Sequence, residues 1–183
     1  MRYTCLFVIV ALAACRTAPG KTGNEKRAAI RHMRDDALAE LYRREPKLKP
    51  KVEGALGYAV FSNFGAKFIL VGSGQGYGIL VENPSGKETF MRVAEVNVGF
   101  GLGVKHFRAI FVFTKAGVMR RFKESGWAFE AAAGAGAAVD GTGVDASLGA
   151  SAEGMWIFIL TKTGVELQAT VGGTKYWQDD ALN

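Results

Sequence analysis

The sequence predicts an α+β fold, mainly an antiparallel β sheet of sandwich or barrel-like form, with an N-terminal amphipathic helix and one further short helix. Three observations support this class. From Gly57 onward, apolar residues alternate with small or polar ones at a period of two, which is typical of half-buried strands. Short turn-forming segments separate these runs and favour antiparallel hairpins. Ahead of them, one segment repeats its apolar residues every three or four positions, as an amphipathic helix does.

The chain begins with the features of an export signal. Leu6–Ala14 is an apolar run that is too short for the roughly 20 residues of a membrane-spanning helix, and Arg2 precedes it. A positive residue, a short apolar run and closing small residues are typical of a secretory signal peptide. Leu12–Cys15 also resembles the bacterial lipobox, which implies cleavage before Cys15 and attachment of diacylglycerol to its sulfur. The alternative is an ordinary signal peptide that contains a cysteine.

These features divide the chain into a signal peptide (1–14), a lipidated cysteine with a flexible tether (15–23) and a single domain (24–183). The other cysteine, Cys5, would leave with the signal peptide, so the mature chain could form no internal disulfide. Arg16 rather than an aspartate follows the cysteine, which favours the outer membrane by the sorting preference of bacterial lipoproteins. We therefore expect an exported, lipid-anchored protein that faces the periplasm or the cell surface.

Two helices are expected. The first runs from Glu25 to Glu45, with Asn24 as its cap and Pro46 as its end. The second covers about Ala116–Glu124, although Gly117 is a weak helix former. One face of the first helix gathers its apolar residues, which are Ile30, Met33, Ala37, Leu38, Leu41 and Tyr42. In the second helix, Val118 and Phe122 share a face.

Positive charge gathers close to the predicted anchor. The net charge is +6, and Arg16–Lys51 holds eleven Lys or Arg against five Asp or Glu, whereas Val52–Asn183 holds eleven against twelve. A basic amphipathic helix beside a lipid anchor suggests contact with a membrane surface. The alternative is that the apolar face packs on the domain and the charges are solvated. The two interpretations are compatible, because a packed helix can still expose its arginines.

The remaining chain is expected to form strands. Ala109–Phe113 and Trp156–Leu160 are continuously apolar, as strands covered on both faces are. These two runs argue against a small transmembrane barrel, whose strands keep one polar face. The other predicted strands are Tyr58–Phe61, Phe68–Val71, Ala94–Lys105, Trp127–Val139, Val144–Ala150 and Val165–Val171. Turns are expected at three segments rich in turn-forming residues, which are 83–86, 140–143 and 162–164.

The many glycines of these segments need a reason, because glycine weakens a strand. On one face of a strand, glycine allows close approach of a crossing sheet, a helix or a ligand chain, and tight sheet packing is the simplest of these. Gly72–Gly78 has glycine at every second position and continues as a strand. A dinucleotide site needs G-x-G-x-x-G between a strand and a helix, so this run does not match one.

No catalytic or metal-binding pattern stands out. His32 and His106 are the only histidines, and with no cysteine in the domain no zinc site is indicated. Asp140 and Asp145 flank a glycine turn, where acids usually help to form the turn. We expect a protein without catalytic activity, cofactor or metal ion. Nucleic acid is not expected as a partner either, because the basic segment lacks interleaved aromatic residues.

Four segments together resemble the SYLF domain. They are "ALGYAVFSNFG" (55–65), "IFVFTKAGVMRRF" (110–122), "GWAFEAAAGAGAAV" (126–139) and "GVELQATVGGTKYWQDDALN" (164–183). The likeness covers about Asp36–Asn183, and the final block, with Gly-Thr-Lys-x-Trp and the closing "DDALN", is its most specific part. The chain departs from the family at Ser62, where many members have a proline.

The SYLF resemblance implies lipid binding, with phosphoinositides as the eukaryotic ligands and actin filaments as partners of some fungal members. Neither is expected in a bacterial envelope, so we expect anionic membrane lipids, with envelope proteins as a second class of partner. The alternative is a structural or protein-interaction lipoprotein without a lipid ligand. In the family, lipid contact is associated with basic residues near the N-terminal helix. Here that role would fall on Lys26, Arg27, Arg31, Arg34, Arg43, Arg44, Lys47, Lys49 and Lys51.

Overall fold

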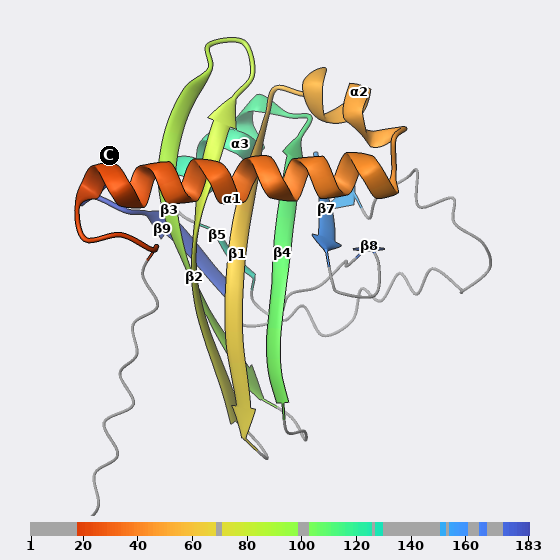
Figure 1. Ribbon diagram of the computed structural model, residues 1–183. Coiled ribbons are helices and arrows are strands. Elements are labelled where there is room, and N and C mark those ends of the chain that lie inside the picture. Colours follow the sequence, from red (N-terminus) through yellow and green to blue (C-terminus); the bar gives the residue numbers. More distant parts are fainter. Residues whose placement is uncertain are drawn as a thin grey trace, which may run out of the picture.

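A single antiparallel sheet forms the body of the protein (Figure 1). The computed structural model describes residues 18–68, 71–98, 103–125, 127–129, 151–152, 154–160, 165–167 and 174–183. Within these residues the sheet has nine strands in the order β5-β9-β3-β2-β1-β4-β7-β6, and β8 pairs with β7 off this path. With the helices that pack on it, the sheet confirms the predicted α+β class.

The elements have the following bounds. The helices of the described residues are α1 (Gly23–Arg44), α2 (Leu48–Glu53) and α3 (Ala116–Glu124). The long strands are β1 (Gly57–Phe68), β2 (Val71–Glu82), β3 (Lys87–Val98) and β4 (Gly103–Phe113). The short strands are β5 (Trp127–Phe129), β6 (Ser151–Ala152), β7 (Met155–Leu160), β8 (Val165–Leu167) and β9 (Thr174–Gln178).

Helix α1 begins two residues earlier than predicted, because Thr22 caps it instead of Asn24. The Glu25 N–H donates to the Thr22 hydroxyl at 3.2 Å, while the Glu25 carboxylate accepts from the backbone N–H groups of Lys21 and Thr22 at 2.7 and 3.3 Å. This reciprocal capping box satisfies amides that the helix leaves open. The same backbone hydrogen bonds lower the pKa of Glu25.

Helix α2 was not predicted. Two prolines hid it: Pro46 precedes the helix and Pro50 lies within it. Pro50 falls in the first turn, however, where its missing N–H would have had no partner inside the helix. Leu48 and Val52 are buried, and their packing explains why so short a helix forms.

Two predicted strands are wrong in their bounds. The alternating run Ala94–Lys105 is not one strand, since β3 ends at Val98 and β4 begins at Gly103. Phe68–Val71 likewise spans the end of β1 and the start of β2. The alternation misled because it continues across a chain reversal. The turn at 83–86 is confirmed, with Gly86 at a φ of 66°.

Several predictions fall outside the described residues. They are Cys15 and the signal peptide, the strand Val144–Ala150, the turns at 140–143 and 162–164, and the parts of Trp127–Val139 and Val165–Val171 beyond Phe129 and Leu167.

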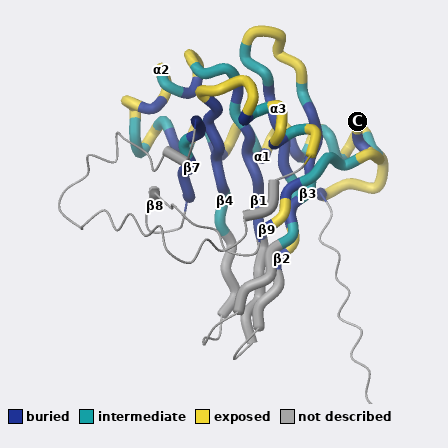
Figure 2. Tube along the Cα trace, turned by 180° about the vertical axis from the view of Figure 1, so that it is seen from behind, coloured by how far each residue is buried: buried dark blue, intermediate teal, exposed yellow. Residues whose placement is uncertain are grey.

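Each face of the sheet buries its own core. The buried residues of the strands lie in the part of the sheet that is nearest to the helices (Figure 2). Along β4, Ile110 and Val112 face α1, whereas Phe111 and Phe113 face α3, which confirms the predicted two-sided burial of this run. The α1 side takes the predicted helix face, with Ile30, Met33, Ala37 and Leu41 buried and Leu38 and Tyr42 partly buried. The α3 side gathers an aromatic cluster, which is Phe61, Phe111, Phe113, Phe122 and Tyr176.

Glycines of β2 serve tight packing within the sheet. A Cβ on Gly78 would lie 2.3 Å from Cδ1 of Phe61 and 2.4 Å from the Val60 carbonyl oxygen. A Cβ on Gly76 would lie 2.1 Å from the Ser62 carbonyl oxygen. Real Cβ atoms do not come this close to backbone, so these positions exclude any side chain. Of the occupants considered for the glycine face, the neighbouring strand β1 is the one that comes close here.

Candidate functional site

Two of the predicted head-group residues, Arg31 and Arg34, bind one carboxylate of the sheet. Arg31 Nε and Nη2 lie 2.8 and 2.7 Å from Oε2 of Glu88, and Arg34 Nη1 lies 2.8 Å from its Oε1. The Arg34 side chain is only 16% exposed. Burial by itself would raise the pKa of Glu88, but the hydrogen bonds from both arginines outweigh it and the pKa is lowered. This cluster fastens the first half of α1 to β3.

Arg27 binds the end of the chain. Its Nη1 donates to the Leu182 carbonyl oxygen at 2.9 Å and its Nη2 to Oδ1 of Asn24 at 2.7 Å. Next to it, the Asn183 side chain accepts from the Phe90 N–H at 2.8 Å and donates to the Phe90 carbonyl oxygen at 2.9 Å. The closing "DDALN" block therefore has a structural task, because Asn183 pairs with the β3 backbone as a further strand would.

Glu40 holds the two arginines at the end of α1. Arg43 donates two hydrogen bonds to this carboxylate, from Nε to Oε2 at 2.9 Å and from Nη2 to Oε1 at 2.8 Å. Arg44 Nε also donates to Oε1. The hydrogen bond from Arg43 is the main cause that lowers the pKa of Glu40 to about 2. Arg43 nevertheless stays largely exposed, at 69%.

The four predicted lysines are bound less firmly. Lys49 Nζ lies 3.8 Å from Oε1 of Glu53, and Lys51 Nζ lies 5.5 Å from the centre of the Trp156 ring. Exposed pairs of the Lys49 type contribute little to stability. Neither Lys26 nor Lys47 forms an ion pair with any residue that the structure describes. Lys47 is exposed and Lys26 is half-buried.

The nine predicted residues do not converge on one site. Lys26 and Lys47 are separated by the length of α1, which at 1.5 Å per residue is about 30 Å. The arginines of the first half face β3, while Arg43, Arg44 and the α2 lysines lie at the other end of the helix (Figure 1). The nine residues thus form a line of cations along α1 and α2 and do not form an anion-binding pocket. Most of the arginines in this line are already paired within the fold.

Helix α3 exposes cations that the prediction did not include. Lys115, Arg120 and Arg121 are exposed, and none of them forms an ion pair within the described part of the chain. Lys123 differs, since its Nζ lies 2.9 Å from Oε1 of Glu82. The helical spacing of residues in α3 could have predicted part of this exposed surface. In a helix that turns Val118 and Phe122 inward, Arg120 lies on the opposite side and Arg121 on the flank.

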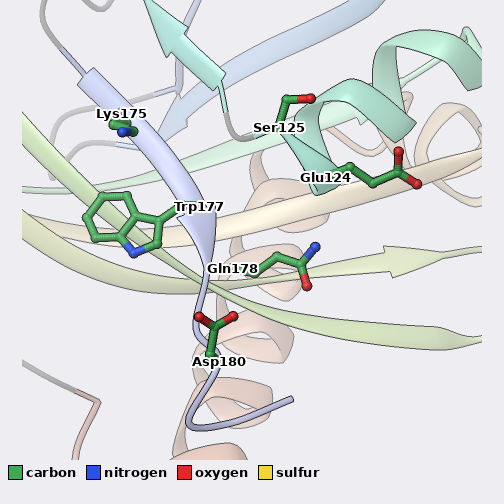
Figure 3. Close-up of a pocket in the computed structure, with 6 residues that line it drawn as sticks. All are labelled: Glu124, Ser125, Lys175, Trp177, Gln178 and Asp180. Carbon is green, nitrogen blue, oxygen red and sulfur yellow. The ribbon is translucent and has the colours of Figure 1, made fainter.

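A surface hollow lies where β9 meets the end of α3 (Figure 3). Its charges are mixed, because Lys175, Glu124 and Asp180 all line the hollow. The Gln178 amide is already used, because Nε2 donates to the Lys123 carbonyl oxygen at 2.8 Å. With two carboxylates beside one ammonium group, the hollow has no preference for anions.

Within the residues that the structure describes, no three His, Cys, Asp or Glu side chains lie close enough to hold a metal ion. His32 pairs instead with Asp36 at 3.1 Å on the exposed side of α1. Of the helices described, none is both long and apolar enough to cross a membrane. The side chain of His106 and both Asp140 and Asp145 fall outside the description.

No protein-family model matches the chain. Among curated proteins, the chain is similar to Beta cell expansion factor A of Aeromonas veronii, with 31% identity over 163 residues. The aligned region is 88% of this chain and 60% of the relative, so the chain spans about 60% of the length of that protein. Identity over so much of the chain indicates a distant homologue.

Proposed function

We propose that the protein is a non-catalytic, SYLF-type envelope lipoprotein that binds anionic lipid head groups. The observation that carries the proposal is the net charge of +6 on a chain whose short apolar run Leu6–Ala14 and lipobox-like Cys15 are the features expected of an exported lipoprotein. The resemblance of four segments to the SYLF domain and the distant homologue support it. Cys15 would carry the acyl anchor and the domain would add contacts of its own.

The hydrogen bonds and ion pairs that basic side chains form within the fold determine which of them are best suited to contact lipid phosphate. A cation near an anionic membrane contributes about 1 kcal/mol. Arg31 and Arg34 would first have to leave Glu88, and Arg27 the Leu182 carbonyl oxygen. Of the nine predicted residues, the exposed Lys47, which has no ion pair with a described residue, can therefore meet phosphate at least cost. Replacing Arg27, Arg31 and Arg34 together would damage the fold and could not measure lipid contact.

The test compares neutral with anionic vesicles. The full chain carries Cys15→Ser, which removes the sulfur of the acyl anchor, and the readout is the ratio of the two partition coefficients. The apolar run Leu6–Ala14 is present with both vesicles, so its contribution cancels in the ratio. We expect a ratio well above one that declines from about 0.1 M salt, with a Debye length of about 10 Å, to about 1 M, with about 3 Å.

The second candidate is a structural or protein-interaction lipoprotein without a lipid ligand. The pairing of Arg31, Arg34, Arg43 and Arg44 with carboxylates favours it, because these charges are matched within the fold. It predicts a ratio near one at the lowest salt, an outcome that would contradict lipid binding by the domain. Attachment would then depend on the acyl chains alone.

The anchor needs its own test. Cells that produce the wild-type chain should incorporate labelled palmitate into it, and the Cys15→Ser chain should remain unlabelled. Equal labelling of both chains would exclude Cys15 as the attachment point, and labelling of neither would favour an ordinary signal peptide.

A further inference from the structure

Helices α2 and α3 lie at the same end of the sheet. Gly57 pairs with both Glu82 and Phe113, and Phe113 pairs with Met155, so these strands start or stop together. Helix α2 leads into this edge and α3 leaves from it. Both views show the two helices at this end (Figures 1 and 2). We call the segments 45–56, 82–87 and 114–125 the α2–α3 end.

The two helices flank this end from opposite faces of the sheet. Leu48 and Val52 of α2 pack into the core on the α1 side, whereas Val118 and Phe122 of α3 pack into the aromatic core. Because these four apolar residues are buried, the end does not offer them to a partner, and attraction to it has to come from charge.

The α2–α3 end carries an excess of positive charge. Its segments hold eight Lys or Arg and four Glu. Lys123 pairs with Glu82 and Lys49 lies near Glu53, which leaves a larger group of cations without an ion pair to any described residue. That group consists of Lys47, Lys87, Lys115, Arg120 and Arg121, all exposed.

Arg120 and Arg121 dominate the outward side of α3. The preceding turn contributes Ala116 and Gly117, so no large side chain of that turn shields the two guanidinium groups. No atom lies within 4 Å of the place where a Cβ on Gly117 would stand, which shows that this side of the helix is open. The stem of the exposed Lys115 packs against Gly154.

We propose that the α2–α3 end is the face that lies on an anionic bilayer, with Arg120 and Arg121 as its main contacts. This inference rests on the proposed function and names the surface that performs it. Lys47 directly precedes α2, Lys87 begins β3 and Lys115 directly precedes α3, so with Arg120 and Arg121 the cations come from three separate segments of this end. A flat phosphate-bearing surface can meet all three segments at once, whereas a single small anion cannot. The strands then stand end-on to the membrane.

The test removes two charges at either of two places in the Cys15→Ser chain. One variant is Arg120→Gln with Arg121→Gln, and the matched control is Lys21→Gln with Lys26→Gln at the far end of α1. With each contact contributing as a basic residue near a charged surface does, the α3 variant should lower the anionic-to-neutral ratio about 30-fold. The control should change it no more than a few-fold.

Three outcomes would overturn the inference. Equal losses from both variants would mean that binding follows net charge, and a larger loss from the control would move the contact to the start of α1. A wild-type ratio near one would contradict lipid binding itself. That result is distinguishable from the other two, because it needs no variant.

Two further experiments guard against a folding artefact. Gly117→Glu adds a carboxylate between the arginines where space is open, and should weaken binding while the unfolding temperature stays close to that of the parent chain. An amine-reactive acetylating reagent should label Lys47 and Lys115 more slowly when anionic vesicles are present, with Lys21 unaffected. Unchanged binding by Gly117→Glu, or protection of Lys21 alone, would contradict the proposed face.

Discussion

Helices α1 and α3 lie on opposite faces of one sheet, and both carry arginines, yet they use them differently. In α1 the arginines meet carboxylates: Arg31 and Arg34 bind Glu88, while Arg43 and Arg44 bind Glu40. Arg120 and Arg121 of α3 meet none among the described residues. The segment with the most basic residues is therefore not the one with the most available charge. Whether a cation can serve a ligand depends on the acids that the fold brings beside it.

This difference has an energetic basis. An arginine paired with a carboxylate through two hydrogen bonds must lose them before it contacts a phosphate, so most of the gain is cancelled. An exposed arginine without such a partner gives up only hydration and side-chain freedom. Four experiments test this difference between α1 and α3.

The largest effect is expected from Phe122→Ala, which removes the side chain that docks α3. Phe122 is fully buried, with ring centres 5.2 Å from Phe111, 5.2 Å from Phe113 and 5.4 Å from Tyr176. Losing this packing should lower the free energy of unfolding by about 3–5 kcal/mol. Urea unfolding measures it, with Arg120→Ala as the surface control. A loss no larger than that of the control would mean that α3 does not depend on this core.

Glu88→Gln should release Arg31 from its carboxylate. The largely buried Arg34 also loses its contact with Glu88 and keeps only the one with Asp35, at 2.8 Å, so the variant should cost about 1–3 kcal/mol of stability. If the arginines of α1 do not bind lipid only because carboxylates hold them, the same variant should bind anionic vesicles more tightly. Urea unfolding and vesicle partition measure the two effects on one sample. Lost stability without any gain in binding would show that α1 is turned away from the membrane.

Acid should weaken the α1 ion pairs, and Glu40 makes the sign clear. Its pKa in the folded chain is about 2, below its ordinary value. A lowered pKa means that the folded chain binds fewer protons, so this contribution is present above the ordinary pKa of about 4.3 and is lost as the pH falls toward 2. The unfolding temperature of the wild-type chain should thus fall more steeply over this range than that of Glu40→Gln. Parallel curves would contradict the assignment.

The spacing of apolar residues along the sequence correctly predicted the elements that depend on neighbouring residues alone. The inward face of α1, the span of α3 and the two continuously apolar strands follow from residue spacing, and the structure has them. The strand bounds at 94–105 were wrong, because glycine and apolar residues keep alternating through the reversal between β3 and β4. Helix α2 was missed because its prolines resemble a break.

The candidate site was harder to predict, because pairing across the sheet has no local signature. Glu88 is more than fifty residues away from Arg31 and Arg34 in the sequence, and only the packing of α1 on the sheet brings them together. The position of Leu182 beside Arg27 depends on the last strand in the same way. The outward direction of Arg120, by contrast, was available from the period of α3 alone.

The smallest effect is expected from Gly117→Ala in α3, and the same replacement at Gly78 in the sheet should act in the opposite direction. Gly117 lies inside the helix with open space where a Cβ would stand, so Gly117→Ala should raise the free energy of unfolding by up to about 1 kcal/mol. Binding to anionic vesicles should not change, because no charge is altered. At Gly78 the same replacement would drive a Cβ into Phe61 and the Val60 carbonyl oxygen, and should destabilise the chain. Urea unfolding measures the free energy of unfolding of both variants. A lower value for Gly117→Ala would mean that α3 needs a flexible backbone at this position. An unchanged value for Gly78→Ala would contradict the close approach of β1 and β2.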